Sequence, residues 1–258
     1  MDVQSYLDRI NYSGDTTPTI ENLNRIHEAH LLTVPFENLD IHLGRPIKLD
    51  KARIFRKIVG DRRGGFCYEM NGLFSWLLEQ LGYDVTLLSS RSVGADGTLG
   101  IEHDHLMLQV KCPADSAEQA NIPWLTDIGW GDNFHTPKRL DQMGVEQDDG
   151  LRLYKIEEAE DGFFIMSQRN YEEVWEKQYR FSLRPHHYSE YAKACHHHQT
   201  SPDSHFPKKR VCTMATPNGR ITLSDDKIII TASGVKHAET ITADQFDPLL
   251  KKHFGIIL

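Results

Sequence analysis

Residues 62–81 read RRGGFCYEMNGLFSWLLEQL, and this stretch constrains the fold more than any other. After the two glycines, apolar residues recur at a spacing of three and four as far as Leu81. Gly82 follows where a glycine commonly ends a helix. The pattern predicts an amphipathic helix over 67–81 that has Cys67 at its start.

The residues upstream of this helix also follow helical spacing, so the first 85 or so residues are predicted to be helical. Thr17 and Pro18 resemble an N-cap and a first-turn proline, and they predict the start of a second helix. From Asp84 the apolar period changes to that of strands, and turn signals separate short segments rich in β-branched and aromatic residues. This part predicts an antiparallel sheet or barrel.

The last third predicts a polar helix near residues 188–198, a hairpin and a terminal helix. The hairpin signal is Pro217-Asn218-Gly219, which lies between VCTMAT and RITLSD. Helices come first, then strands, then a mixture of the two. That order predicts the α+β class.

Composition limits the possible functions of the 258 residues. The net charge of 29 − 37 = −8 argues against nucleic acid or an anionic membrane as the main partner. No apolar run approaches the ~20 residues of a membrane span, and the start MDVQSYLDRI does not resemble a secretory signal. The four cysteines lie far apart without a CxxC pair, which favours a reducing, cytoplasmic location.

Cys67 is the candidate nucleophile. At a helix N-terminus the unpaired N–H groups and the positive end of the dipole favour a thiolate, and they lower a thiol pKa from ~8.5 into the ~3.5–7.5 range. The same N–H groups are suited to stabilise an oxyanion. The alternative is a buried cysteine that acts as a small apolar residue.

A nucleophilic cysteine needs a base, and the base is usually oriented by a third polar group. His105 begins the alternating segment HLMLQV, where a strand fixes an imidazole well; His103 shares its parity and is the rival. Asp127 lies in the apolar segment PWLTDIGWG, where a buried carboxylate needs a partner. Asp104 and Asp132 are the weaker candidates for this third group.

Five segments together resemble the arylamine N-acetyltransferase family: VPFENLDI at 34–41, RRGGFCYEMN, HLMLQV, TDIGWGD and SPDSHF at 201–206. The resemblance is collinear over about residues 20–225. It implies a Cys-His-Asp triad in a cysteine-protease-like core, and the matching positions are Cys67, His105 and Asp127. Trp130 departs from the family pattern, which more often has Phe there. So does the histidine-rich stretch at 194–200.

The resemblance also implies three parts: a helical bundle over 1–85 that carries the cysteine, a β-barrel over 86–187 that carries the histidine and the aspartate, and an α/β lid over 188–258. Arg63, Glu69 and Asn71 are expected to support the loop rather than to react. The remaining predicted contacts are, for the cofactor, Gly129, Trp130, Gly131, Ser201 and Ser204, and, for the substrate pocket, Phe36, Phe66 and Trp130.

The histidine cluster at His186–His205 invites a metal-site interpretation, mainly through Cys195-His196-His197-His198. Adjacent residues on a helix point about 100° apart, so they do not converge on one ion. No second ligand pair with metal spacing follows. The sequence therefore predicts no metal site, and it predicts that His196, His197 and His198 are dispensable for the chemistry.

These observations predict an acetyl-CoA:arylamine N-acetyltransferase that works by a ping-pong reaction through S-acetyl-Cys67. The expected acceptors are arylamines and arylhydrazines, together with the oxygen of N-hydroxyarylamines. Acetyl-CoA is expected as a co-substrate, without a tightly bound cofactor. One alternative is a cysteine hydrolase or transglutaminase-like acyltransferase with the same triad. The other is a non-catalytic metal-binding protein built on the histidine cluster. The sequence carries no signal for the oligomeric state.

Overall fold

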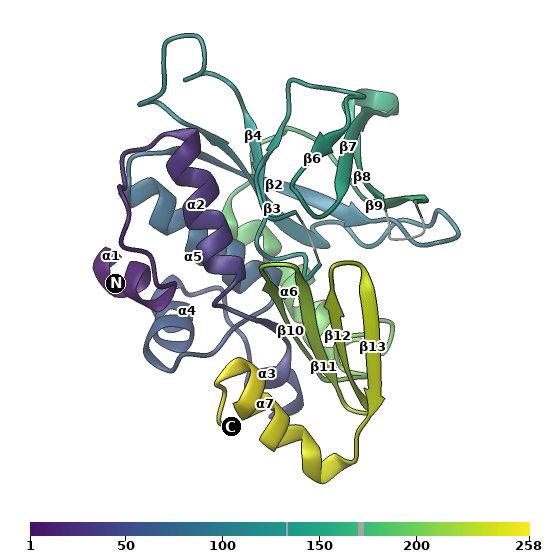
Figure 1. The fold of residues 1–258 in the computed structure, drawn as a ribbon. Helices are drawn as coiled ribbons and strands as arrows, with labels where there is room; N and C mark the ends of the chain where they lie inside the picture. Colours follow the sequence, from purple (N-terminus) through teal and green to yellow (C-terminus); the bar gives the residue numbers. More distant parts are fainter. Residues whose placement is uncertain (133, 170–172) are drawn as a thin grey trace.

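The structure is a computed structural model that describes residues 1–132, 134–169 and 173–258. Figure 1 shows the N-terminal helices beside one antiparallel sheet, with a smaller sheet below it. The α-helices are α1 (Val3–Arg9), α2 (Ile20–Leu31), α3 (Leu39–His42), α4 (Lys51–Phe55), α5 (Cys67–Gln80), α6 (Ala192–Thr200) and α7 (Phe246–Phe254). The π-helix η1 (Arg56–Gly60) continues α4, and the 3-10 segments are η2 (Glu160–Gly162), η3 (Tyr188–Tyr191) and η4 (Ala243–Gln245).

The larger sheet has eight antiparallel strands in the order β5-β4-β3-β2-β9-β8-β7-β6. Its strands are β2 (Asp84–Ser92), β3 (His105–Lys111), β4 (Trp124–Thr126), β5 (Lys138–Arg139), β6 (Gln147–Asp148), β7 (Leu153–Glu158), β8 (Phe164–Arg169) and β9 (Trp175–Phe181). The Gln147 side chain joins the two edge strands, because it accepts from the Arg139 N–H at 2.7 Å and donates to its carbonyl at 2.9 Å. The sheet is a nearly closed barrel, and the α+β prediction is confirmed.

The smaller sheet has the order β1-β10-β11-β12-β13. Its strands are β1 (Phe36–Glu37), β10 (Val211–Thr216), β11 (Gly219–Ser224), β12 (Lys227–Ala232) and β13 (Val235–Thr240). The predicted hairpin is present, since Thr216 pairs with Gly219 across a two-residue turn. Because β1 comes from the N-terminal part of the chain, this sheet joins the first and last segments. The division at residues 85 and 187 stays a prediction.

The predicted helix over 67–81 is α5, which ends at Gln80 with Leu81 as its C-cap, and Gly82 then adopts a φ of +91°. The predicted start of α2 was wrong by two residues. Thr19 is the N-cap, and its side chain accepts from the Asn22 N–H. The Thr17 N–H and hydroxyl donate instead to the Asp15 carboxylate.

A buried charged cluster supports the loop that leads into α5. We call Glu37, Asp40, Lys57, Arg63 and Glu69 the charged cluster. Arg63 contacts Glu37 at 2.8 Å and Asp40 at 3.2 Å. Lys57 contacts Asp40 and Glu69, each at 2.9 Å. Because the cationic side chains lie between carboxylates, the cluster joins η1 to β1, α3 and α5.

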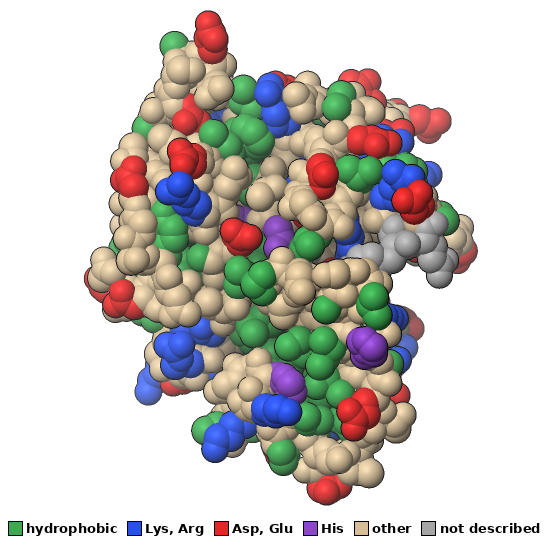
Figure 2. All heavy atoms as spheres, viewed as in Figure 1, with side chains coloured by type: hydrophobic (Ala, Val, Ile, Leu, Met, Phe, Trp, Pro, Cys, Tyr) green, Lys and Arg blue, Asp and Glu red, His purple; other side chains and the backbone are tan. Residues whose placement is uncertain are grey.

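Figure 2 shows acidic and basic side chains interspersed over one face of the molecule. Hydrophobic side chains gather on that face over the five-stranded sheet, where Ile230 and Val235 are exposed. Within the described residues, no helix combines the length and the apolar character that a membrane crossing requires.

Candidate active site

Cys67 is buried at the first position of α5. The turn before it is held by Glu69, whose carboxylate accepts from the Phe66 N–H at 3.2 Å. Glycine is needed twice at this point: a Cβ on Gly64 would lie 1.9 Å from the Pro35 carbonyl oxygen, and one on Gly129 would lie 2.8 Å from the Cys67 Cα. Both backbones pack too closely for a side chain, which brings the segment after β4 against the cysteine.

His105 is the first residue of β3, and its Nε2 lies 2.8 Å from Oδ2 of Asp127. Both side chains are buried, and Asp127 directly follows β4 rather than lying within it. The alternation predicted for β3 is present. Leu106 and Leu108 pack with the helices, whereas Met107, which shares the parity of His105, packs inside the barrel. The strand therefore directs His105 away from the helical core.

Asn71 connects the pair to α5. Its side-chain amide donates to Oδ1 of Asp127 at 2.8 Å, and its oxygen accepts from the Ile128 N–H at 3.0 Å. The Gly129 N–H donates to the same Oδ1 at 2.9 Å. Asn71 lies one helical turn after Cys67, so one helix positions both the thiol and the carboxylate that orients His105.

A cavity of about 240 Å³ opens at this point. Its lining is Phe36, Cys67, Ser92, Asp104, His105, Gly129, Trp130, His198, His205 and Phe206. The thiol and the imidazole therefore share one cavity. Aromatic rings form much of the remaining wall.

The environment of Cys67 opposes a free thiolate. Burial raises the pKa of the thiol well above its usual value, the backbone of Leu106 lowers it, and the carboxylates of Asp104 and Asp127 raise it further. The sequence predicted a thiolate at Cys67 that the helix N-terminus favours and His105 stabilises as an ion pair. Because burial raises the pKa of the thiol, a thiolate here needs a neighbouring cation.

Comparison with known proteins identifies the family. A family model described as N-acetyltransferase matches residues 19–258. The arylamine N-acetyltransferase of Mycolicibacterium smegmatis is 33% identical over 263 residues, which cover all of this chain and 93% of the relative. The chain belongs to the arylamine N-acetyltransferase family. It is accordingly an acetyltransferase.

Solved structures of arylamine N-acetyltransferases share this fold. The enzyme from Mycobacterium marinum, solved in complex with CoA, superposes with a TM-score of 0.90 at 30% identity over 99% of this chain and 93% of its own. The enzyme from Bacillus cereus has a TM-score of 0.88 at 26% identity, with full coverage of both chains, and is described as having a Cys-His-Glu catalytic triad. In this acetyltransferase an aspartate contacts the histidine.

The acetyltransferase has two of the three predicted pocket residues on the cavity wall. Trp130 packs edge-on to His105, with ring centroids 4.9 Å apart, and Phe36 lies nearby. Phe66 is fully buried and packs edge-on against Phe206, with ring centroids 5.9 Å apart, and it does not line the cavity. Phe66 is the N-cap residue of α5, and its side chain points into the core. Its position next to Cys67 in the sequence does not indicate this direction.

The predicted cofactor contacts are only partly consistent with this geometry. The Gly129 N–H is already bound to Asp127, so the expectation of a free amide there was wrong. Ser204 is buried and its hydroxyl lies 3.3 Å from Nδ1 of His198, and the Ser201 hydroxyl accepts from the Asp203 N–H. Both serines organise their own loop. Trp130 lines the cavity, and Gly131 lies against the Phe36 ring.

Sequence reasoning missed a second buried pair on the cavity wall. Asp104 lies 2.9 Å from Nε2 of His198, and its other oxygen accepts from Ser92. Burial raises the pKa of Asp104, but hydrogen bonds from His198 and Ser92 more than offset it and lower the pKa to about 2. The sequence treated His196, His197 and His198 alike, whereas only His198 of these lines the cavity.

Proposed function

We propose that this chain transfers an acetyl group from acetyl-CoA to the nitrogen of arylamines or arylhydrazines, and to the oxygen of N-hydroxyarylamines. The transfer passes through S-acetyl-Cys67, with His105 as the base and Asp127 as the group that orients it. The observation that carries the proposal is the His105–Asp127 contact of 2.8 Å beside a cavity that Cys67 shares. Family membership supports the same reaction class.

The first half-reaction begins with a proton transfer. Because Nε2 of His105 contacts Asp127, Nδ1 is the ring nitrogen that takes the proton of the Cys67 thiol. The imidazolium then supplies the cation that a thiolate needs at this buried position. The thiolate attacks the thioester carbonyl of acetyl-CoA, and first-turn amides of α5 stabilise the oxyanion. CoA leaves as its thiol after it receives the proton from His105.

The second half-reaction is aminolysis of the enzyme thioester. The acceptor nitrogen attacks the acetyl carbonyl and loses a proton to His105, and the Cys67 sulfur leaves and is reprotonated. This step needs a nitrogen with a free lone pair. Alkyl amines are mostly protonated at neutral pH, with a pKa of ~10.4, whereas anilines are not. A wall that includes Phe36, Trp130 and Phe206 also favours a flat ring.

Intact-mass measurement tests the intermediate. We expect one acetyl group per chain after incubation with acetyl-CoA and no acceptor, and none on the Cys67→Ala variant. The Cys212→Ala variant is the matched control, because Cys212 is also buried but lies in β10, outside the cavity lining. An aniline should remove the acetyl group faster than an alkyl amine at pH 7. A stoichiometric acetyl adduct on the Cys67→Ala variant contradicts the mechanism. Loss of the acetyl group at the same rate with and without either amine favours a hydrolase instead.

The His105→Gln variant tests the source of the thiolate. Burial raises the pKa of Cys67, and the variant lacks the imidazolium that opposes this rise. We therefore expect the pH midpoint of iodoacetamide alkylation to lie above the ~8.5 of a free thiol in the variant and below it in the parent chain. The His196→Gln variant, which changes an exposed histidine outside the cavity lining, should keep the parent midpoint. Equal pH midpoints of alkylation in the parent chain and the His105→Gln variant would show that His105 is not the proton acceptor.

A further inference from the structure

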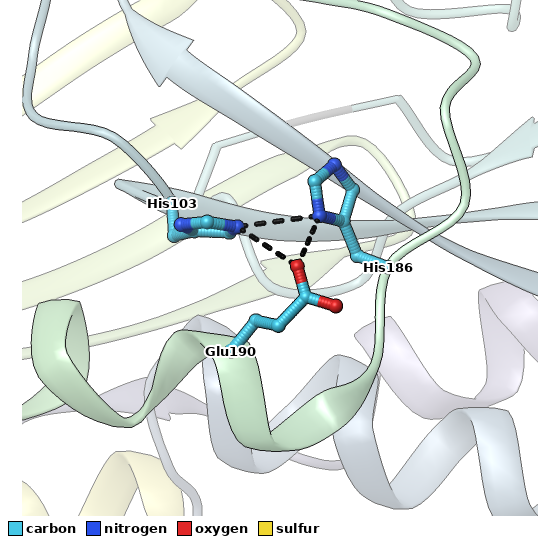
Figure 3. Close-up of side chains that lie close together, drawn as sticks. All are labelled: His103, His186 and Glu190. Atoms are coloured by element: carbon cyan, nitrogen blue, oxygen red, sulfur yellow. Dashed lines mark hydrogen bonds and ion pairs between the residues drawn. The ribbon is translucent and has the colours of Figure 1, made fainter.

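Three side chains outside the acetyl-transfer site converge on one point. Figure 3 shows His103, from the turn before β3, His186, from the segment after β9, and Glu190, from η3. Nε2 of His103 lies 3.2 Å from Nδ1 of His186. Oε2 of Glu190 lies 2.8 Å from that Nδ1 and 3.6 Å from the His103 Nε2.

We propose that His103, His186 and Glu190 form a binding site for a divalent transition-metal ion of the zinc type. Zinc binds imidazole nitrogens at ~2.0–2.1 Å and carboxylate oxygens at ~2.0–2.2 Å, so neighbouring ligand atoms of a tetrahedral site are about 3.3 Å apart. The three separations of 3.2, 2.8 and 3.6 Å bracket that value. The sequence predicted no metal site, and the site proposed here uses none of the residues in Cys195-His196-His197-His198.

Hydrogen bonds alone do not satisfy this triangle. A ring nitrogen presents either one N–H or one lone pair. If Nδ1 of His186 donates to Glu190, it does not also accept from His103, and the remaining contact of 3.6 Å is too long for a hydrogen bond. A metal ion accepts a lone pair from all three atoms at once.

The surroundings hold the ligands in place. The second carboxylate oxygen of Glu190 accepts from the His187 N–H at 2.8 Å, which directs Oε2 toward the two rings. Both rings pack on the buried Tyr191, with centroid distances of 5.1 and 6.2 Å. Outer contacts of this kind orient metal ligands.

A cavity beside the two histidines leaves room for a fourth ligand. His103 and His186 line a separate cavity of about 390 Å³, whose other charged residues are Arg91, Glu102, Arg180 and Arg184. The arginines weaken cation binding by repulsion, and they favour an anionic fourth ligand such as hydroxide or a carboxylate. Such a position is typical of exchangeable three-ligand sites.

Metal binding at this point is expected to stabilise the start of β3. His103 directly precedes Asp104 and His105, and the Tyr68 hydroxyl lies 2.8 Å from the His103 carbonyl oxygen. The ion would tie this turn to η3 in the last third of the chain. A ligand that binds only the folded state raises its stability.

The test is a Zn²⁺ titration of the full, chelator-treated chain against a chromophoric chelator. The Cys67→Ala background is used so that the thiol does not compete for the ion. We expect one Zn²⁺ per chain and a higher melting temperature with Zn²⁺. His186→Gln and Glu190→Gln should each weaken binding by at least about 10-fold. His187→Gln, which changes the exposed neighbouring histidine, should bind as the parent does.

Absence of stoichiometric Zn²⁺ binding overturns the proposal, as does unchanged affinity in His186→Gln and Glu190→Gln. A Co²⁺ spectrum of the Cys67→Ala chain, without any further substitution, reports the ligands directly and does not depend on whether the other variants fold. The expected spectrum has d–d bands of a four-coordinate ion without a thiolate charge-transfer band. A strong thiolate band assigns the ion to a cysteine and contradicts the site. None of these readouts depends on acetyl transfer.

Discussion

Asp127→Asn is expected to slow acetylation of Cys67 by about 10³–10⁴-fold, the scale of loss when a triad carboxylate becomes an amide. Oδ1 of Asp127 accepts from both Asn71 and the Gly129 N–H, and Oδ2 contacts His105. An asparagine has only one side-chain oxygen, and the two fixed donors hold it on their side. The NH₂ group then faces His105 and forces Nε2 to accept, which leaves the hydrogen on Nδ1. A ring in that tautomer does not take the thiol proton.

The measurement is the rate of acetyl incorporation followed by intact mass, together with the urea unfolding curve. Asp132→Asn is the matched control, because Asp132 pairs with Arg152 and Arg220 and lies outside the cavity lining. It should acetylate at nearly the parent rate. A folded Asp127→Asn chain with full activity would contradict the assignment, and Asp104 would be the next carboxylate to replace.

Arg63→Met is expected to lower the free energy of unfolding by about 3–5 kcal/mol, because it leaves buried carboxylates without their cation. Glu37 is 0% exposed, and Arg63 donates to it from Nε at 3.0 Å. Lys57 lies 3.7 Å from the same oxygen and compensates only in part. The Glu37 N–H donates to the Gly65 carbonyl, so the loop before Cys67 should loosen as well.

Urea unfolding measures this effect, and Arg62→Met is the matched control. Arg62 is the exposed neighbour of Arg63, and its replacement should change the free energy of unfolding by no more than about 0.5 kcal/mol. Arg63→Lys should recover part of the loss, since it restores the charge without the planar fork. Equal stability of the two methionine variants would show that the charged cluster does not support the fold.

The sequence by itself determined the local elements that carry the chemistry. The amphipathic period after Gly65 defined α5 and placed Cys67 at its first position. The alternation in HLMLQV defined the faces of β3 and therefore the direction of His105. These features follow from side-chain periodicity within about ten residues, which the backbone geometry of helices and strands converts directly into faces.

The sequence pattern alone left His103 as an alternative base to His105, and Asp104 as an alternative orienting carboxylate to Asp127. The family resemblance favoured His105 and Asp127. His103 is two residues before His105, so strand alternation predicted that both side chains would point to the same face. The structure shows why this prediction was misleading for His103. It adopts a φ of +57° in the turn before β3, so it does not continue the strand and points to the Glu190 side instead. A single left-handed residue leaves no periodic signal.

Only the tertiary structure decided which distant side chains meet. It paired Asp104 with His198, placed β1 in the C-terminal sheet, and moved Phe66 from the cavity wall into the core. It also brought His186 and Glu190 together with His103, apart from the rest of the histidine cluster. Each of these contacts joins segments whose spacing follows no helical or strand period. They depend on how sheets, helices and loops pack against one another, and a periodic pattern in sequence does not encode that packing.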